Sequence, residues 1–205
     1  MKKFICISLC VLLCMGMFLG CGTSVSSEDN LVYVDKKGRV TSVDVETLDE
    51  NYYDASELEN FVKEEIDSYT EEHGKGTVSL EKLTAEEGKA KLTMRYKTTQ
   101  DYSEFNGIEL YQGKIVKALA AGYDFKADFL KVENGKVTGS ATTKEIYATE
   151  DLKVVIIKAN TDVQVAGEIC YISNENVELT GTDTVSIRGT DDSFETDVYT
   201  YIIYK

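Results

Sequence analysis

A run of apolar residues late in the chain is the feature that most constrains the fold. Residues 152–158 read Leu-Lys-Val-Val-Ile-Ile-Lys, so four β-branched residues follow one another with no polar residue between them. β-Branched residues favour strands. A strand without alternation of apolar and polar residues is typical of one buried on both faces. The sequence therefore predicts a central strand here, with another layer packed on each side of it.

Strand-like segments are concentrated around and after this run. They are rich in β-branched and aromatic residues and lie between turn residues, at 162–173, 176–179, 184–188 and 196–204. Earlier strands are predicted at 31–34, 39–45, 77–83, 90–97, 125–133 and 136–140, the last two joined by the hairpin dipeptide Asn134-Gly135. Because strands and helices do not alternate as a parallel sheet requires, we expect an α+β fold with a mainly antiparallel sheet and a strand-rich C-terminal half.

One long amphipathic helix is predicted at residues 57–72. Its apolar residues recur at positions i, i+3, i+4, i+8 and i+11, which places them on one face: Leu58, Phe61, Val62, Ile66 and Tyr69. We expect this face to pack on a sheet and to bury the Phe61 ring, so that Phe61→Ala would cost about 3–5 kcal/mol. One or two short helices are expected near 101–107 and 113–121, and 144–148 is a further candidate turn.

Charge excludes one class of partner and leaves another open. The chain has 22 Lys and Arg against 36 Asp and Glu, a net charge of −14. Binding along a nucleic-acid backbone requires clustered cations, so no nucleic-acid partner is expected. Residues 49–72 contain ten acids and one Lys, a net charge of −9. This stretch is either a solvated helix face or a steering surface for a cationic partner or divalent ion.

The N-terminus has the layout of a secretory signal peptide. Lys2 and Lys3 precede an apolar core that runs from Phe4 to Leu19 and is followed by Gly20. The sequence Phe18-Leu19-Gly20-Cys21 resembles the lipobox of bacterial lipoproteins, although Phe18 replaces the usual Leu and Leu19 the usual small residue. The resemblance implies that the Cys21 thiol is diacylglycerylated and that Cys21 becomes the first residue of the mature chain.

This reading divides the chain into three parts. Residues 1–20 are the lipoprotein signal peptide, residues 21–30 are the lipidated Cys and a short tether, and residues 31–205 are an extracytoplasmic α+β domain. The expected partner is the cell membrane, which the chain would contact through the lipid on Cys21 at its extracytoplasmic face. The alternatives are cleavage by the ordinary signal peptidase and retention of the segment as an anchor.

The cysteines support no disulfide and no metal site. Three of the five lie in the predicted signal peptide, and Cys21 would carry lipid, so Cys170 is left alone in the mature domain. Its flanking residues supply no cation that would activate a thiolate. We expect Cys170 to be a buried and inert thiol.

No catalytic residue, metal ligand or cofactor is predicted. His73 is the one histidine and has no recognisable nucleophile motif beside it, so we expect a surface residue. Two alternatives stay open: the acidic stretch Asp191–Asp197 with Asp183 as a calcium site, and Tyr199 with Tyr201, on one strand face, as a platform for sugar or peptide. A pair of catalytic carboxylates is also compatible with so acidic a chain.

A family resemblance adds location but no activity. The lipobox, residues 101–107 (DYSEFNG), residues 120–125 (AAGYDF) and residues 151–162 (DLKVVIIKANTD) together resemble small lipoproteins of Gram-positive gut anaerobes, a group without an assigned activity. We therefore expect a lipid-anchored extracytoplasmic lipoprotein that is a non-catalytic binding or structural module. The alternatives are an accessory or solute-capturing lipoprotein of a transport system and a carboxylate-based cell-envelope hydrolase.

Overall fold

The computed structural model describes residues 25, 27–48, 55–86, 88–149, 151–189 and 194–205. The predicted signal peptide, the lipobox and Cys21 lie outside the described residues. Strands account for 46% of the described residues and helices for 23%, which confirms a strand-rich α+β fold. All described helices and strands lie between Leu31 and Tyr204.

Sheet A, as we name the first of two sheets, has seven strands in the order β11-β12-β9-β1-β2-β4-β3. Its strands are β1 (Leu31–Val34), β2 (Val40–Thr47), β3 (Val78–Glu86), β4 (Lys89–Tyr96), β9 (Asp162–Val165), β11 (Val177–Leu179) and β12 (Thr184–Ile187). Neighbouring strands are antiparallel except β1 and β9, which pair in parallel from Leu31 opposite Asp162 to Val34 opposite Val165. The antiparallel pair β1–β2 is therefore joined to a strand from the C-terminal half.

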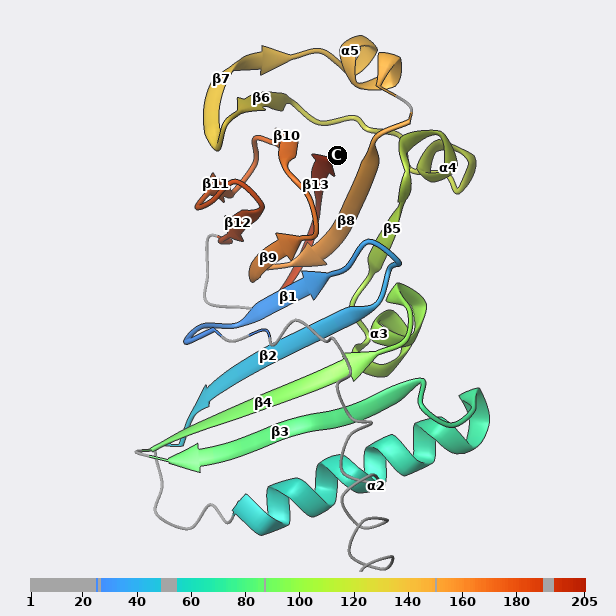
Figure 1. The fold of residues 1–205 in the computed structure, drawn as a ribbon, viewed down its shortest axis with the longest axis vertical. Coiled ribbons are helices and arrows are strands. Elements are labelled where there is room, and N and C mark those ends of the chain that lie inside the picture. The colour runs from blue at the N-terminus through green and yellow to red at the C-terminus, as the bar shows by residue number, and fades with distance from the viewer. Residues whose placement is uncertain (1–24, 26, 49–54, 87, 150, 190–193) are drawn as a thin grey trace, which may run out of the picture.

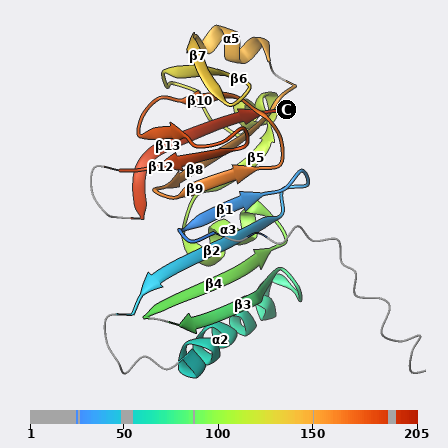
Figure 2. The same ribbon diagram turned by 60° about the vertical axis from the view of Figure 1, so that its left-hand side comes forward.

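Sheet B has six antiparallel strands in the order β5-β8-β13-β10-β6-β7. Its strands are β5 (Leu110–Lys114), β6 (Phe129–Glu133), β7 (Lys136–Ala141), β8 (Lys153–Ala159), β10 (Ile169–Ser173) and β13 (Glu195–Tyr204). The predicted turn between β6 and β7 is confirmed, with φ of 53° at Asn134 and 69° at Gly135. Figures 1 and 2 show β9 beside β1, and β8 on the far side of β9, where the two sheets meet.

The predicted strand with two buried faces is β8. Val155, Ile157 and Ala159 enter a first core, to which both sheets contribute. Val154 and Ile156 enter a second core on the other face of sheet B. Two short helices cover this second core, α4 (Ile115–Ala120) and α5 (Thr143–Ala148), through buried residues of each. The apolar run therefore supplies side chains to two cores at once, as its composition predicts.

Helix α2 (Ala55–His73) lies alongside β3 (Figure 1), but the predicted amphipathic face is not confirmed. Val62 is buried in the first core, and Leu58, Ile66 and Tyr69 pack against that core. Phe61 is 60% exposed, so the expectation that its ring is buried is wrong. Adjacent helical residues point in different directions, and the narrow contact with β3 takes in Val62 and leaves Phe61 in solvent.

The exposure of Phe61 lowers the expected cost of the substitution Phe61→Ala. We expect Phe61→Ala to change the free energy of unfolding by only about 0.5 kcal/mol, as for other exposed residues. Val62→Ala on the buried side should cost about 1–3 kcal/mol. Urea unfolding of the two variants checks both values. A larger loss for Phe61→Ala than for Val62→Ala would contradict the placement of α2.

The remaining helix, α3 (Thr99–Asn106), has well-formed ends. The Thr98 side chain accepts a hydrogen bond from the Asp101 backbone N–H at its start, and Gly107 closes it with φ of 70°. Tyr102 of α3 is buried in the first core. In the described part of the chain, no helix is both long and apolar enough to cross a membrane.

Candidate binding groove

The two faces of sheet A differ in chemistry. Because side chains alternate along strands, Val40, Met94 and Tyr96 point into the first core. Tyr33, Thr41 and Arg95 are partners in register on the opposite face. We call this the outer face of sheet A. At these three positions it presents polar or charged side chains, while their neighbours Val40, Met94 and Tyr96 point into the core.

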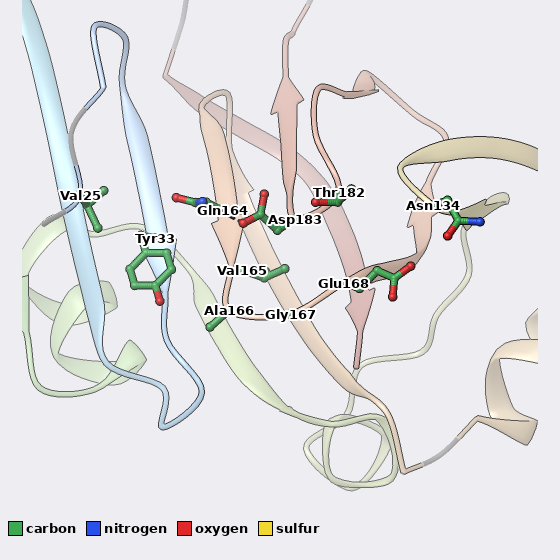
Figure 3. Close-up of a pocket in the computed structure, with 10 residues that line it drawn as sticks. All are labelled: Val25, Tyr33, Asn134, Gln164, Val165, Ala166, Gly167, Glu168, Thr182 and Asp183. Atoms are coloured by element: carbon green, nitrogen blue, oxygen red, sulfur yellow. Dashed lines mark hydrogen bonds between the residues drawn. The ribbon is translucent and has the colours of Figure 1, made fainter. Parts of the chain in front are cut away.

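A groove of about 740 Å³ crosses the outer face of sheet A near β1, β9 and β12 (Figure 3). Its volume is within the usual range of small-molecule sites. The lining residues come from the segment before β1, from β1 and β9, from the β6–β7 turn and from the β9–β10 and β11–β12 loops: Val25, Tyr33, Asn134, Gln164, Val165, Ala166, Gly167, Glu168, Thr182 and Asp183.

Asp183 holds a carboxylate at the wall of this groove. Gln164 Nε2 donates a hydrogen bond to Asp183 Oδ2 at 2.9 Å, and Thr184 Oγ1 donates one to Asp183 Oδ1 at 2.9 Å. The Asp183 main-chain carbonyl accepts from the Val165 N–H at 2.9 Å. These contacts fix the side chain between β9 and β12. A carboxylate has about four lone-pair sites, so Asp183 keeps acceptor capacity for a ligand.

The second carboxylate of the groove is already engaged. Glu168 Oε2 lies 2.9 Å from Lys205 Nζ, and the two residues also exchange both main-chain hydrogen bonds. The hydrogen bond to Glu168 raises the pKa of Lys205 above its ordinary value. Beside them, a side-chain carbon at Gly167 would collide with the Lys205 carbonyl oxygen. Glycine therefore permits the close passage of the chain end along the groove.

A second hollow, of about 490 Å³, adjoins the groove and shares Tyr33 and Ala166 with it. We call it the basic pocket, because five cations line it against one acid, Asp35: Lys36, Lys37, Arg39, Arg95 and Lys97. The Arg39 guanidinium forms an ion pair with Asp35 at 2.6 Å, and Arg95 donates two hydrogen bonds of 2.6 Å to Glu81. The pocket is a local concentration of positive charge in a chain of net charge −14.

Three of these cations have no partner of opposite charge among the described residues. Within the part of the chain that the structure describes, Lys36, Lys37 and Lys97 are exposed and form no ion pair. The turn between β1 and β2 supplies two of them, and the third follows the end of β4. The sequence analysis missed this cluster, since its members come from separate segments.

A comparison of the chain with protein-family models, with curated proteins and with solved structures found no match. Any function must therefore be argued from the chain's own residues.

His73 belongs to a contact between α2 and α3. Its ring stacks on Tyr69 with centroids 4.0 Å apart, and its Nδ1 lies 3.4 Å from Glu104 Oε2. The Tyr69 hydroxyl donates to Glu104 at 3.0 Å and lies 3.3 Å from Asp101 Oδ1. Burial and these acidic neighbours raise the pKa of Tyr69. The His73 side chain is partly exposed at the end of α2, as expected of a surface residue.

The predicted face shared by Tyr199 and Tyr201 is confirmed, with ring centroids 6.3 Å apart. Tyr201 is buried in the second core, and Tyr199 packs against it. The Tyr199 hydroxyl donates to Glu109 at 2.9 Å, and the Tyr123 hydroxyl donates to the same carboxylate at 3.1 Å. The rings of Tyr199 and Tyr201 are engaged in packing, and the Tyr199 hydroxyl in a hydrogen bond, which argues against a free aromatic platform.

The other candidates have simple surroundings. Cys170 is half-buried rather than fully buried, and burial raises the pKa of its thiol, which lowers the thiolate fraction. Most of the stretch Asp191–Asp197 lies outside the described residues. Among the residues that the structure does describe, no group of three or more His, Cys, Asp or Glu is placed to hold a metal ion.

Proposed function

We propose that the chain is a lipid-anchored extracytoplasmic binding module, attached through Cys21, whose groove on sheet A takes up a polar solute without chemical change. The lipobox-like sequence at residues 18–21 supports the anchor. The open groove supports the binding role.

The observation that carries the binding role is the Asp183 carboxylate at the groove wall. Gln164 and Thr184 hold both of its oxygens at 2.9 Å, so its position is set before a ligand arrives. Preorganised acceptors lower the entropic cost of binding. Beside it, the groove presents the Tyr33 ring and the side chains of Thr182 and Asn134. This combination suits a ligand rich in hydroxyl or ammonium donors, such as a sugar or the amino end of a peptide.

Binding is favoured over hydrolysis by the state of the two groove carboxylates. A glycosidase-type reaction requires one carboxyl group that donates a proton and a second that acts as a base or nucleophile. Glu168 is paired with Lys205, and Asp183 is held by two neutral donors. Solute capture on behalf of a transport system is the second candidate function, supported by the same open groove.

Replacement of Asp183 tests the proposal. We expect Asp183→Asn to raise the dissociation constant for a probe that binds the groove at least tenfold, because one charge-assisted acceptor is lost. Isothermal titration of residues 21–205 with N-acetylglucosamine and with trialanine checks this. Asp128→Asn, a change at an exposed acid outside the groove, is the matched control. Conversion of either probe to a product, or equal affinity in both variants, would contradict the proposal.

A further inference from the structure

The segment that follows the proposed anchor lies against the outer face of sheet A. Val25 lines the groove. Glu28 Oε1 lies 2.8 Å from Lys91 Nζ on β4, and the Asn30 side chain accepts a hydrogen bond from the Val45 N–H on β2 at 2.7 Å. These contacts tie the start of the domain to this face.

Chain length then limits how far this face can lie from the bilayer. Cys21 is four residues before Val25, and four residues span at most about 14 Å when fully extended. If Cys21 carries the lipid, Val25 remains within that distance of the modified residue, and the groove begins at Val25. The basic pocket adjoins the same groove through Tyr33 and Ala166. The pocket is therefore placed near the membrane surface.

Helix α2 and the basic pocket lie on opposite sides of sheet A and carry opposite charge. Helix α2 packs against the side that faces the first core. Its acidic residues are mostly exposed there, including Glu57, Glu64, Glu65, Asp67, Glu71 and Glu72. The basic pocket opens on the outer face. Since exposed charges farther apart than about 8 Å are largely screened at physiological ionic strength, an anionic surface near the pocket would interact mainly with the pocket.

We propose that the basic pocket binds the anionic headgroups of the bilayer in which the Cys21 lipid is inserted, as a second attachment that fixes how the domain faces the membrane. This proposal depends on the lipid anchor at Cys21, which is part of the proposed function. The exposed ammonium groups of Lys36, Lys37 and Lys97 would donate to phosphate oxygens, without any ion pair of their own to break among the described residues. Arg39 and Arg95, held by Asp35 and Glu81, would add to the positive potential.

Vesicle binding tests the pocket separately from the anchor. The protein is the mature chain, residues 21–205, with Cys21→Ser so that no acyl chain contributes; it contains every described helix and strand. We expect it to sediment with vesicles of phosphatidylglycerol and phosphatidylcholine, less so at high salt, and not with phosphatidylcholine alone. Each lysine near an anionic surface raises the partition coefficient onto vesicles about fivefold. Lys36→Gln/Lys37→Gln/Lys97→Gln should therefore weaken the partition coefficient about 100-fold.

A matched variant separates the pocket from net charge. Lys117, Lys136 and Lys144 are exposed on α4, β7 and α5, so Lys117→Gln/Lys136→Gln/Lys144→Gln makes the same change of charge elsewhere. We expect this variant to bind vesicles like the parent, with both triple variants showing the circular dichroism of the parent. Equal loss in the two variants would overturn the proposal. Failure of the parent to bind vesicles would also overturn the proposal. This holds even if the parent binds a soluble glycerol-phosphate polymer, because the ligand would then be a free phosphate polymer and not a membrane. Vesicle binding together with an unlabelled Cys21 in cells would contradict the anchor while supporting the pocket.

Discussion

Cys21→Ser is expected to abolish lipid labelling of the chain and to release it from the membrane fraction. The thiol of Cys21 is the group that would receive the diacylglyceryl unit, and serine offers no thiol in its place. Two acyl chains contribute about 0.8 kcal/mol for each buried CH₂, which is enough for stable attachment where a single chain gives only marginal binding. The contribution of the basic pocket is smaller and is screened by salt, so its lysines should not retain the protein on membranes washed at high salt after this substitution.

The measurement is metabolic labelling with an alkyne analogue of palmitate in a bacterium that processes lipoproteins, followed by fractionation. Cys14→Ser is the matched control, because it makes the same atomic change within the predicted signal peptide. We expect Cys14→Ser to be labelled and membrane-bound like the parent. Labelling or membrane retention of Cys21→Ser at the level of the parent would contradict the lipobox interpretation.

The parts of the fold that could be predicted are those encoded by short patterns. Residues 152–158 indicated a strand with two buried faces, and β8 has them. Asn134-Gly135 indicated a hairpin, and its positive φ angles join β6 to β7. Both signals depend on neighbours in the chain, so no knowledge of the tertiary structure was required.

The parts that could not be predicted depend on contacts between distant segments. The parallel pairing of β1 with β9 brings Leu31 opposite Asp162, and no local pattern specifies such a pair. The spacing of apolar residues at 57–72 predicts a helix, and α2 is one, but the pattern does not show how wide a stripe the sheet covers. Phe61 is exposed because the contact is narrower than the stripe.

The same limit applies to the candidate site. The sequence indicates Asp183 only as part of a calcium site with the acidic stretch 191–197, whereas its side chain is held by Gln164 of β9. The predicted strands leave Lys36 and Lys37 in the gap between 31–34 and 39–45, and place Lys97 at the end of 90–97. Their proximity follows from the register of β1, β2 and β4, which places these ends together. A sequence pattern cannot supply that register.

The two faces of β8 should be equally sensitive to truncation. Ile156 and Ile157 are adjacent, both are almost fully buried, and they enter different cores. Each substitution, Ile156→Ala or Ile157→Ala, removes methyl and methylene groups and leaves a cavity, for a cost of about 2–5 kcal/mol. In a chain of this size that corresponds to a fall in the melting midpoint of roughly 4–20 °C. The double variant would lose a large share of a typical domain stability of about 5–15 kcal/mol, so the single variants are the informative ones.

Urea unfolding of residues 21–205 measures these losses. Val137→Ala on β7, where the side chain is 48% exposed, is the control at an edge strand of the same sheet. We expect it to change the free energy of unfolding by about 0.5 kcal/mol or less. If Ile157→Ala were costly and Ile156→Ala were not, the second core under α4 and α5 would not exist as described. If instead Ile156→Ala were costly and Ile157→Ala were not, the first core, which contains Ile157 and residues of both sheets, would not exist as described. The apolar run would then form a strand that is covered on one face.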